Sequence, residues 1–261
     1  MMKIIVLLSM VLSLLVSAQE EVPPKYMRFI PLGEIPVWKE EIVDSTRVQK
    51  EYEPGEMPPK DIMIGVREGS MESSKLFLRE FTGLFTFSGA LERLKIGQGA
   101  EGSASAWLDS AMAKPRYSLG VLYRDHEDMT WLKPRLKIFR DDLTVFPLGT
   151  MRFANVSLND VLIKVNDQEP FLVKPGDAIV YPIAVGGVRV QATAVTQEGL
   201  HRRIYDNNLE LRENERVQGF FFKSQSPAPA NPVQIFYYPE KFVSPKKPKE
   251  DEADKEDDSQ P

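Results

Sequence analysis

Cysteine is missing from all 261 positions of the chain, and histidine occurs only twice, at His126 and His201. Without cysteine there is no disulfide framework, no thiol catalysis and no thiolate zinc site. The lipid anchor of bacterial lipoproteins is excluded as well, because it is attached to an N-terminal cysteine. A hydrophobic core of ordinary size must therefore hold the fold together.

Long apolar runs are also scarce, and the one marked run lies near the N-terminus. It covers the 13 residues 4–16, follows a lysine and precedes two small residues. Such a run is too short to span a bilayer and has the length of a signal-peptide core. We expect residues 1–18 to be a signal peptide cleaved between Ala18 and Gln19, with an uncleaved anchor as the alternative. The mature chain is then exported, periplasmic or extracellular, and has no transmembrane segment.

The formal net charge of −5 comes largely from the other end of the chain. Residues 246–258 contain seven acidic side chains and four lysines, which gives this stretch a net charge of −3. Because one alanine is the sole apolar residue after position 243, we expect residues 242–261 to form a disordered acidic tail. No basic face is visible elsewhere in the sequence, which argues against a nucleic-acid partner.

The 20 prolines and the aromatic content of 10% favour many short strands over long helices. Turn residues such as Asn166-Asp167 separate apolar, alternating segments. Strands are predicted at 26–30, 41–43, 61–66, 75–79, 84–87, 93–96, 104–108, 117–124, 134–139, 150–156, 161–165, 171–173, 178–182, 188–195, 202–205, 217–223 and 233–238. This regular spacing, with turn chemistry between the strands, predicts an all-β sandwich or barrel.

A weak internal repeat divides the strands into two sets. Gly120 begins a run of one glycine, three apolar residues and one basic residue, and a proline-led strand starts 14 residues later. Gly219 begins the same pattern, with its proline 13 residues later, so the offset of 99 residues matches the size of one immunoglobulin-like sandwich. We therefore predict two tandem immunoglobulin-like antiparallel β-sandwich units, with chance matching of apolar residues as the alternative.

The predicted organisation follows from these boundaries. It comprises a signal peptide at 1–18, a proline-spaced segment at 19–60 that packs partly on the first unit, a first β-sandwich unit at 61–142, a second at 143–241 and the disordered tail at 242–261.

Several segments resemble exported bacterial β-sandwich proteins of unknown function, including such proteins from verrucomicrobial bacteria. One is the segment Ile30-Pro31-Leu32-Gly33-Glu34-Ile35-Pro36, which is similar to a "YPLGEIP" pattern, and another is residues 141–157, which are similar to "DDLxxFPxGxxRxxNxS". A turn at 173–176 and a strand at 188–192 complete the likeness, which extends loosely over residues 26–238. The resemblance implies a sandwich fold and export, and it implies no activity.

Motifs that carry chemistry are weak in this sequence. Residues 97–102 match G-x-G-x-x-G, but the flanks read as strands, so we interpret the motif as a hairpin loop and not as a dinucleotide site. His126 lies in an acidic cluster at 124–128 that could bind a cation, yet no second ligand group at metal spacing is visible. Neither G-x-S-x-G nor H-E-x-x-H occurs. We assign no catalytic residue, no cofactor and no metal.

Aromatic side chains offer one further hypothesis, a platform on which sugar rings could stack. The candidates are Trp38, Trp107, Trp131, Tyr237 and Tyr238. Sandwich cores also need large aromatic residues, and strand alternation places Trp107 inward. We therefore predict a binding surface formed by Trp131, Tyr237 and Tyr238, with core packing as the alternative.

Together these observations favour a non-enzymatic protein with a binding or structural role at the bacterial cell envelope, where its partner is a protein or a glycan. One alternative is a hydrolase or lyase that acts on an extracellular polysaccharide through carboxylates on sandwich loops. Another is a subunit of an envelope assembly that pairs edge strands. A cleft that holds two acids with raised pKa values would favour the enzyme.

Overall fold

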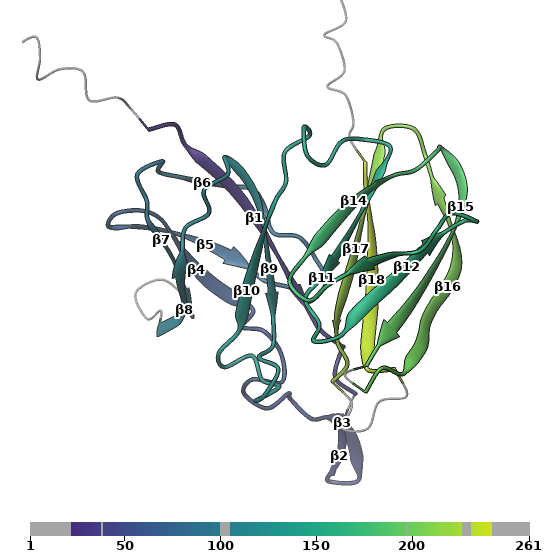
Figure 1. The fold of residues 1–261 in the computed structure, drawn as a ribbon. Coiled ribbons are helices and arrows are strands. Elements are labelled where there is room, and N and C mark those ends of the chain that lie inside the picture. Colours follow the sequence, from purple (N-terminus) through teal and green to yellow (C-terminus); the bar gives the residue numbers. More distant parts are fainter. Residues whose placement is uncertain (1–21, 38, 100–104, 197, 226–230, 242–261) are drawn as a thin grey trace, which may run out of the picture.

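The structure, a computed structural model, describes residues 22–37, 39–99, 105–196, 198–225 and 231–241. These residues form eighteen β-strands and no helix (Figure 1). The described part of the chain accordingly offers no helix with the length and apolarity that crossing a bilayer requires. The signal peptide predicted at 1–18, with its cleavage site between Ala18 and Gln19, and the tail predicted at 242–261 lie outside the described residues.

Two four-stranded sheets form a first sheet pair, with strand orders β10-β9-β1-β6 and β5-β4-β7-β8. Its strands are β1 (Lys25–Leu32), β4 (Asp61–Arg67), β5 (Ser70–Lys75), β6 (Phe85–Phe87), β7 (Arg93–Gln98), β8 (Ser105–Ala111), β9 (Tyr117–Tyr123) and β10 (Arg135–Arg140). Ile62, Ile64 and Val66 alternate along β4 and meet Phe29 and Trp107 in one buried cluster. The two sheets therefore enclose a common apolar core between them.

A second sheet pair has strand orders β14-β11-β17-β18 and β13-β12-β15-β16. Its strands are β11 (Thr150–Asn155), β12 (Asp160–Val165), β13 (Phe171–Val173), β14 (Ala178–Pro182), β15 (Gly186–Val195), β16 (His201–Leu211), β17 (Glu215–Lys223) and β18 (Val233–Lys241). Val161, Ile163 and Val165 alternate along β12 and pack with Phe153 and Phe221 in a second core.

The two sheet pairs repeat one strand order. In each pair the first strand runs parallel to the penultimate strand, as β1 with β9 and β11 with β17, and β4 to β8 have the same neighbours as β12 to β16. The glycines of the sequence repeat occupy equivalent positions, because Gly120 lies opposite Phe29 and Gly219 lies opposite Phe153. A Cβ atom at Gly120 would lie 2.6 Å from the ring of Phe29, so this ring packs directly on the backbone.

The all-β prediction is confirmed, and the structure corrects it in detail. The strand predicted at 75–79 is wrong, because β5 ends at Lys75, residues 76–79 lie in no strand, and β5 pairs with β4 after a tight turn at Gly69. The two parallel strand pairs were not expected in a purely antiparallel fold. β1 lies between β9 and β6, so the segment 19–60 contributes an interior strand to a sheet and does more than cover it. The division at 61–142 and 143–241 stays a prediction.

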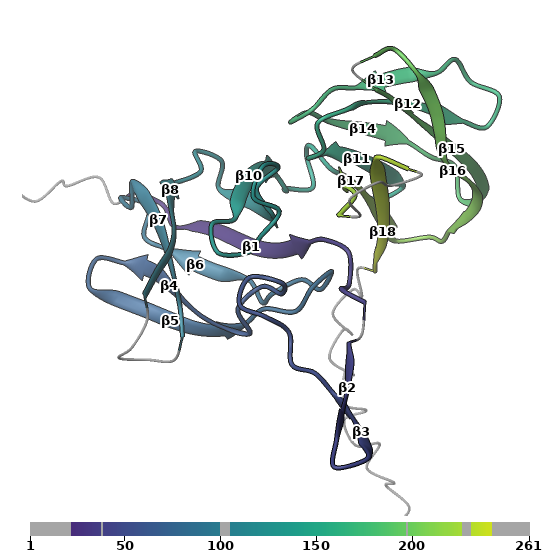
Figure 2. The same cartoon turned by 90° about the horizontal axis from the view of Figure 1, so that it is seen from below.

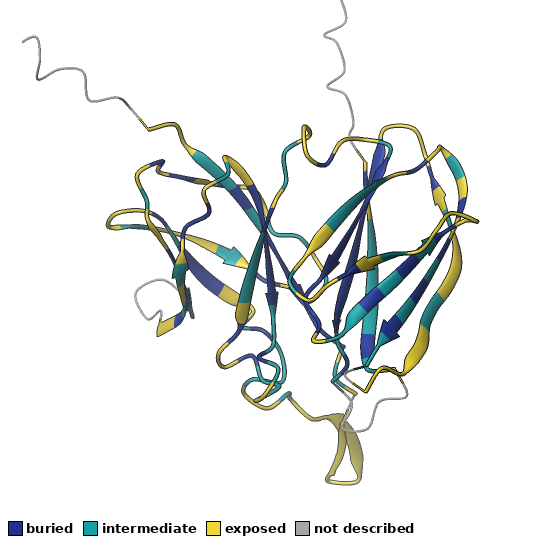
Figure 3. Cartoon of the chain, in the orientation of Figure 1, coloured by how far each residue is buried: buried dark blue, intermediate teal, exposed yellow. Residues whose placement is uncertain are grey.

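The two sheet pairs also pack on each other, through the outer faces of the sheets that contain β1 and β11 (Figure 3). We call this contact the inter-pair interface, and its buried apolar residues are Ile30, Leu32, Leu119, Val121, Phe139, Ala154, Val156, Phe220 and Phe222. All six residues of β11 are buried, since its two faces lie against the second core and this interface. Each large apolar side chain buried in this way contributes about 1.5–3 kcal/mol, so the interface joins the two pairs into one body.

A fifth, two-stranded sheet stands apart from this body. It consists of β2 (Glu40–Val43) and β3 (Thr46–Gln49), which pair with each other alone among the described strands. Figures 1 and 2, which view the molecule along different directions, both show this hairpin projecting from the body.

Candidate functional site

The β2–β3 hairpin exposes every one of its eight strand residues. Its register pairs Glu40 with Gln49 and Val43 with Thr46. Ile42 is 74% exposed, and Val43 and Val48 are 47% and 41% exposed. Solvent-exposed β-branched apolar residues on both faces of a projecting ribbon have no structural task in the described part of the chain, so we regard the hairpin as the candidate binding element.

The turn of the hairpin is formed by two residues in the left-handed region. Asp44 has a φ of 48° and Ser45 a φ of 65°. Positive φ at both central positions is typical of the type I′ turn, whose twist matches that of a two-stranded ribbon. Asp tolerates this conformation better than most residues, whereas Ser45 adopts it at some cost. The turn therefore fixes the register and twist of the exposed strands.

The base of the hairpin is tied to the body by polar contacts. The Lys39 ammonium binds the Glu56 carboxylate at 2.6 Å, and the Arg124 guanidinium donates to the backbone carbonyl of Glu56. The backbone N–H of Trp131 donates to the carbonyl of Gly55 at 2.8 Å. These bonds orient the hairpin while leaving its strands uncovered.

A second polar feature, the junction charge cluster, lies at one end of the inter-pair interface. It contains Arg28, Asp141, Arg152, Arg216 and Glu240, which come from both sheet pairs and from the segment between them. Arg28 lies 2.7 Å from Asp141 and 2.8 Å from Glu240. Arg152 lies 3.0 Å from Asp141, and Arg216 lies 2.9 Å from Glu240.

The charges of this cluster are stabilised by contact with one another and with an aromatic ring. The guanidinium carbons of Arg152 and Arg216 lie 4.1 and 4.4 Å from the ring centroid of Phe146. Burial favours the neutral acid at Glu240, but Arg28 and Arg216 outweigh it and lower the pKa of Glu240 below its ordinary value. Burial lowers the pKa of Arg152 to about 10, so this side chain remains a cation at neutral pH.

A pocket of about 540 Å³ opens beside the junction charge cluster. Its lining includes Asp141, Asp142 and Glu240, together with the exposed apolar side chains of Leu84 and Leu143. Burial opposes ionisation of Asp142, but hydrogen bonds from Thr144 and Arg140 hold its pKa at about 2. Both perturbed carboxyl groups of this pocket are therefore shifted towards the ionised form, which is the opposite of what a general acid needs.

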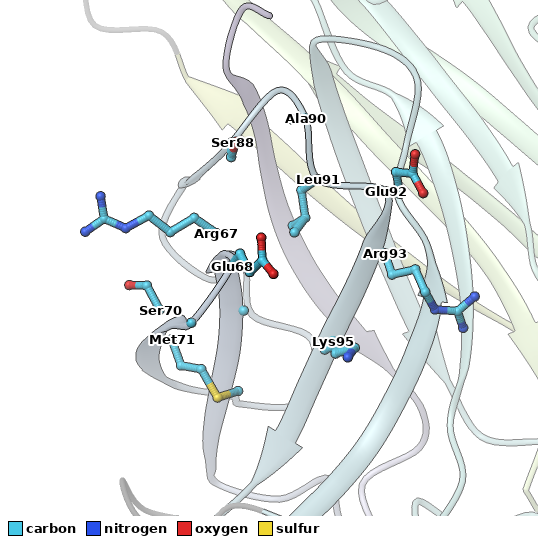
Figure 4. A pocket seen from close by; sticks show the side chains of 12 residues that line it. Arg67, Glu68, Ser70, Met71, Ser88, Ala90, Leu91, Glu92, Arg93 and Lys95 are labelled. Atoms are coloured by element: carbon cyan, nitrogen blue, oxygen red, sulfur yellow. The ribbon is translucent and has the colours of Figure 1, made fainter.

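A second pocket, also of about 540 Å³, lies on the outer face of the sheet that contains β4 and β7. Met71 and Leu91 give it an apolar lining, and Arg67 and Arg93 lie at its margins. Figure 4 shows the side chains of Arg67 and Arg93 extending in opposite directions, and Arg93 already binds Asp109 at 2.8 Å. The cations do not converge, so the pocket does not form a site for one charged group.

The aromatic surface predicted from the sequence is not assembled by the structure. Trp131 is 1% exposed and lies in the first core, where its backbone carbonyl accepts a hydrogen bond from the Trp107 indole at 2.6 Å. The predicted exposure of Trp131 is wrong, because its ring completes a core whose partners are distant in sequence. Tyr237 packs on the second core, 4.8 Å from Tyr205, and Tyr238 packs at 4.7 Å on Phe81. Since neighbouring strand residues point to opposite faces, Tyr237 and Tyr238 cannot share one platform.

The remaining sequence motifs have structural positions. Gly97 and Gln98 lie in β7 and Gly99 follows with a φ of 107°, whereas the rest of that motif is outside the described residues. The ring of His126 lies 5.4 Å from that of Tyr123, and Asp125 pairs with Arg135. In the described part of the chain, no three histidine or acidic side chains are grouped in a way that could hold a metal ion.

The sequence hypothesis missed two features of the candidate region. It predicted a strand at 41–43 but not β3, although Asp44-Ser45 between two β-branched stretches is a hairpin signal that could have revealed it. It also missed the junction charge cluster, for which the sequence carries no local signal.

Comparisons with known proteins add little to this description. No protein-family model matches the chain, and a search of curated proteins gives no match either. Ten chains of solved structures match. One, a crystal structure of a candidate cell adhesion protein from Bacteroides eggerthii, is 6% identical, covers 86% of this chain and 98% of its own, and has a TM-score of 0.21. At this TM-score the likeness supports no conclusion about fold or function.

Proposed function

We propose that the protein is an exported, non-enzymatic binding module at a bacterial cell envelope, built from two tandem immunoglobulin-like β-sandwich units. The signal peptide predicted from the sequence at residues 1–18 supports export. The repeated strand order of the two sheet pairs, with an offset of 99 residues between Gly120 and Gly219, supports the two-unit interpretation. The partner of the protein is an envelope protein or glycan, which it contacts in the periplasm or outside the cell.

The observation that carries this proposal is the contrast between a closed body and an open hairpin. Apolar surface is packed away wherever two sheets meet, yet Ile42, Val43 and Val48 are exposed on a ribbon with a defined turn. Apolar residues presented by a preformed element suit the contact with a partner, because less conformational entropy is lost on binding.

The competing interpretation is a polysaccharide hydrolase or lyase that uses the carboxylates of the junction pocket. Such an enzyme needs one carboxyl group that stays protonated near neutral pH. The pKa values of Asp142 and Glu240 are lowered, and both groups are engaged by arginines. The lowered pKa values of these two carboxyl groups therefore support the non-enzymatic proposal.

The full chain, expressed with its own N-terminus in a bacterial host, tests the proposal. We expect a mature protein that begins at Gln19, that binds saturably to isolated envelopes, and that releases no new ends from a panel of polysaccharides. Retention of Met1 would contradict export. Turnover of a polysaccharide that is lost in Asp142→Asn would replace the binding module by the enzyme.

A further inference from the structure

We infer that the outer edge of β2 binds an extended polypeptide segment of a partner protein, rich in basic and β-branched residues, as a third strand of the hairpin sheet. The inference rests on the proposed binding function and names the partner class and the surface. Because a glycan has no peptide backbone to pair with a strand, it excludes a glycan as the ligand of this edge.

The register shows which backbone groups are available at this edge. The backbone N–H of Lys50 donates to the carbonyl of Lys39 at 2.8 Å, so this pair is hydrogen-bonded. Hydrogen-bonded and non-hydrogen-bonded pairs alternate along an antiparallel ladder. The pairs Glu40–Gln49 and Ile42–Arg47 are therefore the non-bonded ones, and the N–H and C=O groups of Glu40 and Ile42 face outward from β2.

The hairpin is incomplete as a sheet. A two-stranded ribbon on its own is marginally stable in water, and a third strand or a packed face is what usually completes it. Both strands have an open edge, and all eight residues are exposed, so no part of the described body completes this sheet. The sheets that contain β4 and β12 differ from the hairpin, because each of them has one face packed on a core.

The charge of the hairpin favours a basic partner. The segment 39–56, which contains the hairpin and its base, has three cations, and all are paired: Lys39 with Glu56, Arg47 with Glu40, and Lys50 with Glu53. Three acids of the same segment, Glu41, Asp44 and Glu51, have no ion pair within the described residues. The uncompensated charge of the hairpin is therefore negative, and it attracts a segment that carries lysine or arginine.

The same charges distinguish the two edges. The acid on the strands without an ion pair among the described residues, Glu41, lies on β2 beside Ile42, whereas the one charged residue of β3, Arg47, is paired with Glu40. A basic strand is therefore attracted more strongly to the β2 edge than to the β3 edge. Main-chain bonds to Glu40 and Ile42 would supply affinity, and the side chains of β2 would select apolar and basic neighbours.

Residue-resolved NMR titration of the ¹⁵N-labelled mature protein tests the inference. The probe is a blocked octapeptide that alternates lysine with valine or threonine, and its counterpart has glutamate in place of lysine. Ile42→Pro removes one of the two outward N–H groups of β2, and Gln49→Pro removes one of the two outward N–H groups of β3. Ile42→Thr keeps the N–H and the strand propensity, and it separates the loss of the backbone donor from the loss of apolar surface.

We expect the basic probe to shift the amide signals of residues 39–43 and to bind more weakly as salt rises. Ile42→Pro should weaken binding up to about tenfold, as expected for the loss of one hydrogen bond, whereas Gln49→Pro should leave it within about twofold. Equal effects of the two proline variants, equal binding of the acidic probe, or shifts confined to residues 246–258 would overturn the inference.

The envelope-binding assay separates this inference from the proposed function. If envelopes bind the wild type and Ile42→Pro equally and the probe leaves residues 39–43 unchanged, the strand-pairing inference fails and the binding module stands. If the probe binds β2 but envelopes bind nothing, the proposed function fails instead.

Discussion

Apolar residues are buried at the inter-pair interface and exposed in the β2–β3 hairpin. At the interface, Phe220 and Ile30 are fully buried between two sheets, and charged groups are paired where they enter this contact. In the hairpin, Ile42 is 74% exposed and no face of the ribbon is covered. The difference shows that the fold is able to bury apolar surface between its sheets, so the uncovered hairpin is a feature that stability alone does not explain.

The largest expected effect comes from opening the interface. Phe220→Ala removes a ring that is 0% exposed, and we expect it to lower the free energy of unfolding by about 4 kcal/mol. Ile42→Ala should change it by less than about 0.5 kcal/mol, because the side chain is already exposed. Urea unfolding of both variants checks this, and equal losses would show that the hairpin is part of the body.

A somewhat smaller loss is expected from the junction charge cluster. Glu240→Gln leaves Arg28 and Arg216 without their shared carboxylate, and we expect a loss of about 3 kcal/mol in unfolding free energy. The matched change Glu41→Gln in the hairpin should have no measurable effect on unfolding. A neutral outcome for Glu240→Gln would show that the cluster is dispensable for joining the sheet pairs.

The pH dependence should distinguish the same two regions. The pKa of Glu240 is lowered in the folded state, so its stabilising contribution is present above the ordinary glutamate pKa of about 4.3 and is lost as the pH falls through the lower folded value. When the pH is lowered below about 4.3, the urea concentration at the unfolding midpoint should therefore decrease for the wild type and should decrease less for Glu240→Gln. Parallel curves would assign the acid sensitivity to other groups.

The smallest expected effect lies in the hairpin turn. Ser45→Gly relieves a residue held at a φ of 65°, and it should stabilise the hairpin locally by about 0.5–1 kcal/mol. Slower amide exchange in residues 40–49, with no change in the global unfolding midpoint, is the expected result. A rise in the global midpoint would mean that the hairpin and the body unfold together.

The sequence allowed the sheets to be predicted better than the site. Alternation along residues 161–165 and the equivalent glycines Gly120 and Gly219 depend on local spacing, and the structure has strands there. The burial of Trp131 and the pairing of Arg28 with Glu240 depend instead on contacts between distant parts of the chain, which local patterns do not encode.

The hairpin lies between these cases. Its first strand was predicted from a short apolar stretch, and its turn could have been recognised from Asp44-Ser45. That the hairpin would remain uncovered could not be read from the sequence, because exposure is decided by which elements pack against it.

Hydrogen–deuterium exchange of the mature protein, with and without the basic octapeptide, compares the closed interface and the open strand edge in one experiment. We expect fast exchange in residues 40–49 and exchange limited by global unfolding in β9 and β17, whose amides lie at the closed interface. Adding the octapeptide should slow exchange in residues 40–43 and leave β9 and β17 unchanged. Slow exchange in the hairpin without the peptide, or exchange in β17 as fast as in the hairpin, would contradict the contrast between a closed interface and an open strand edge.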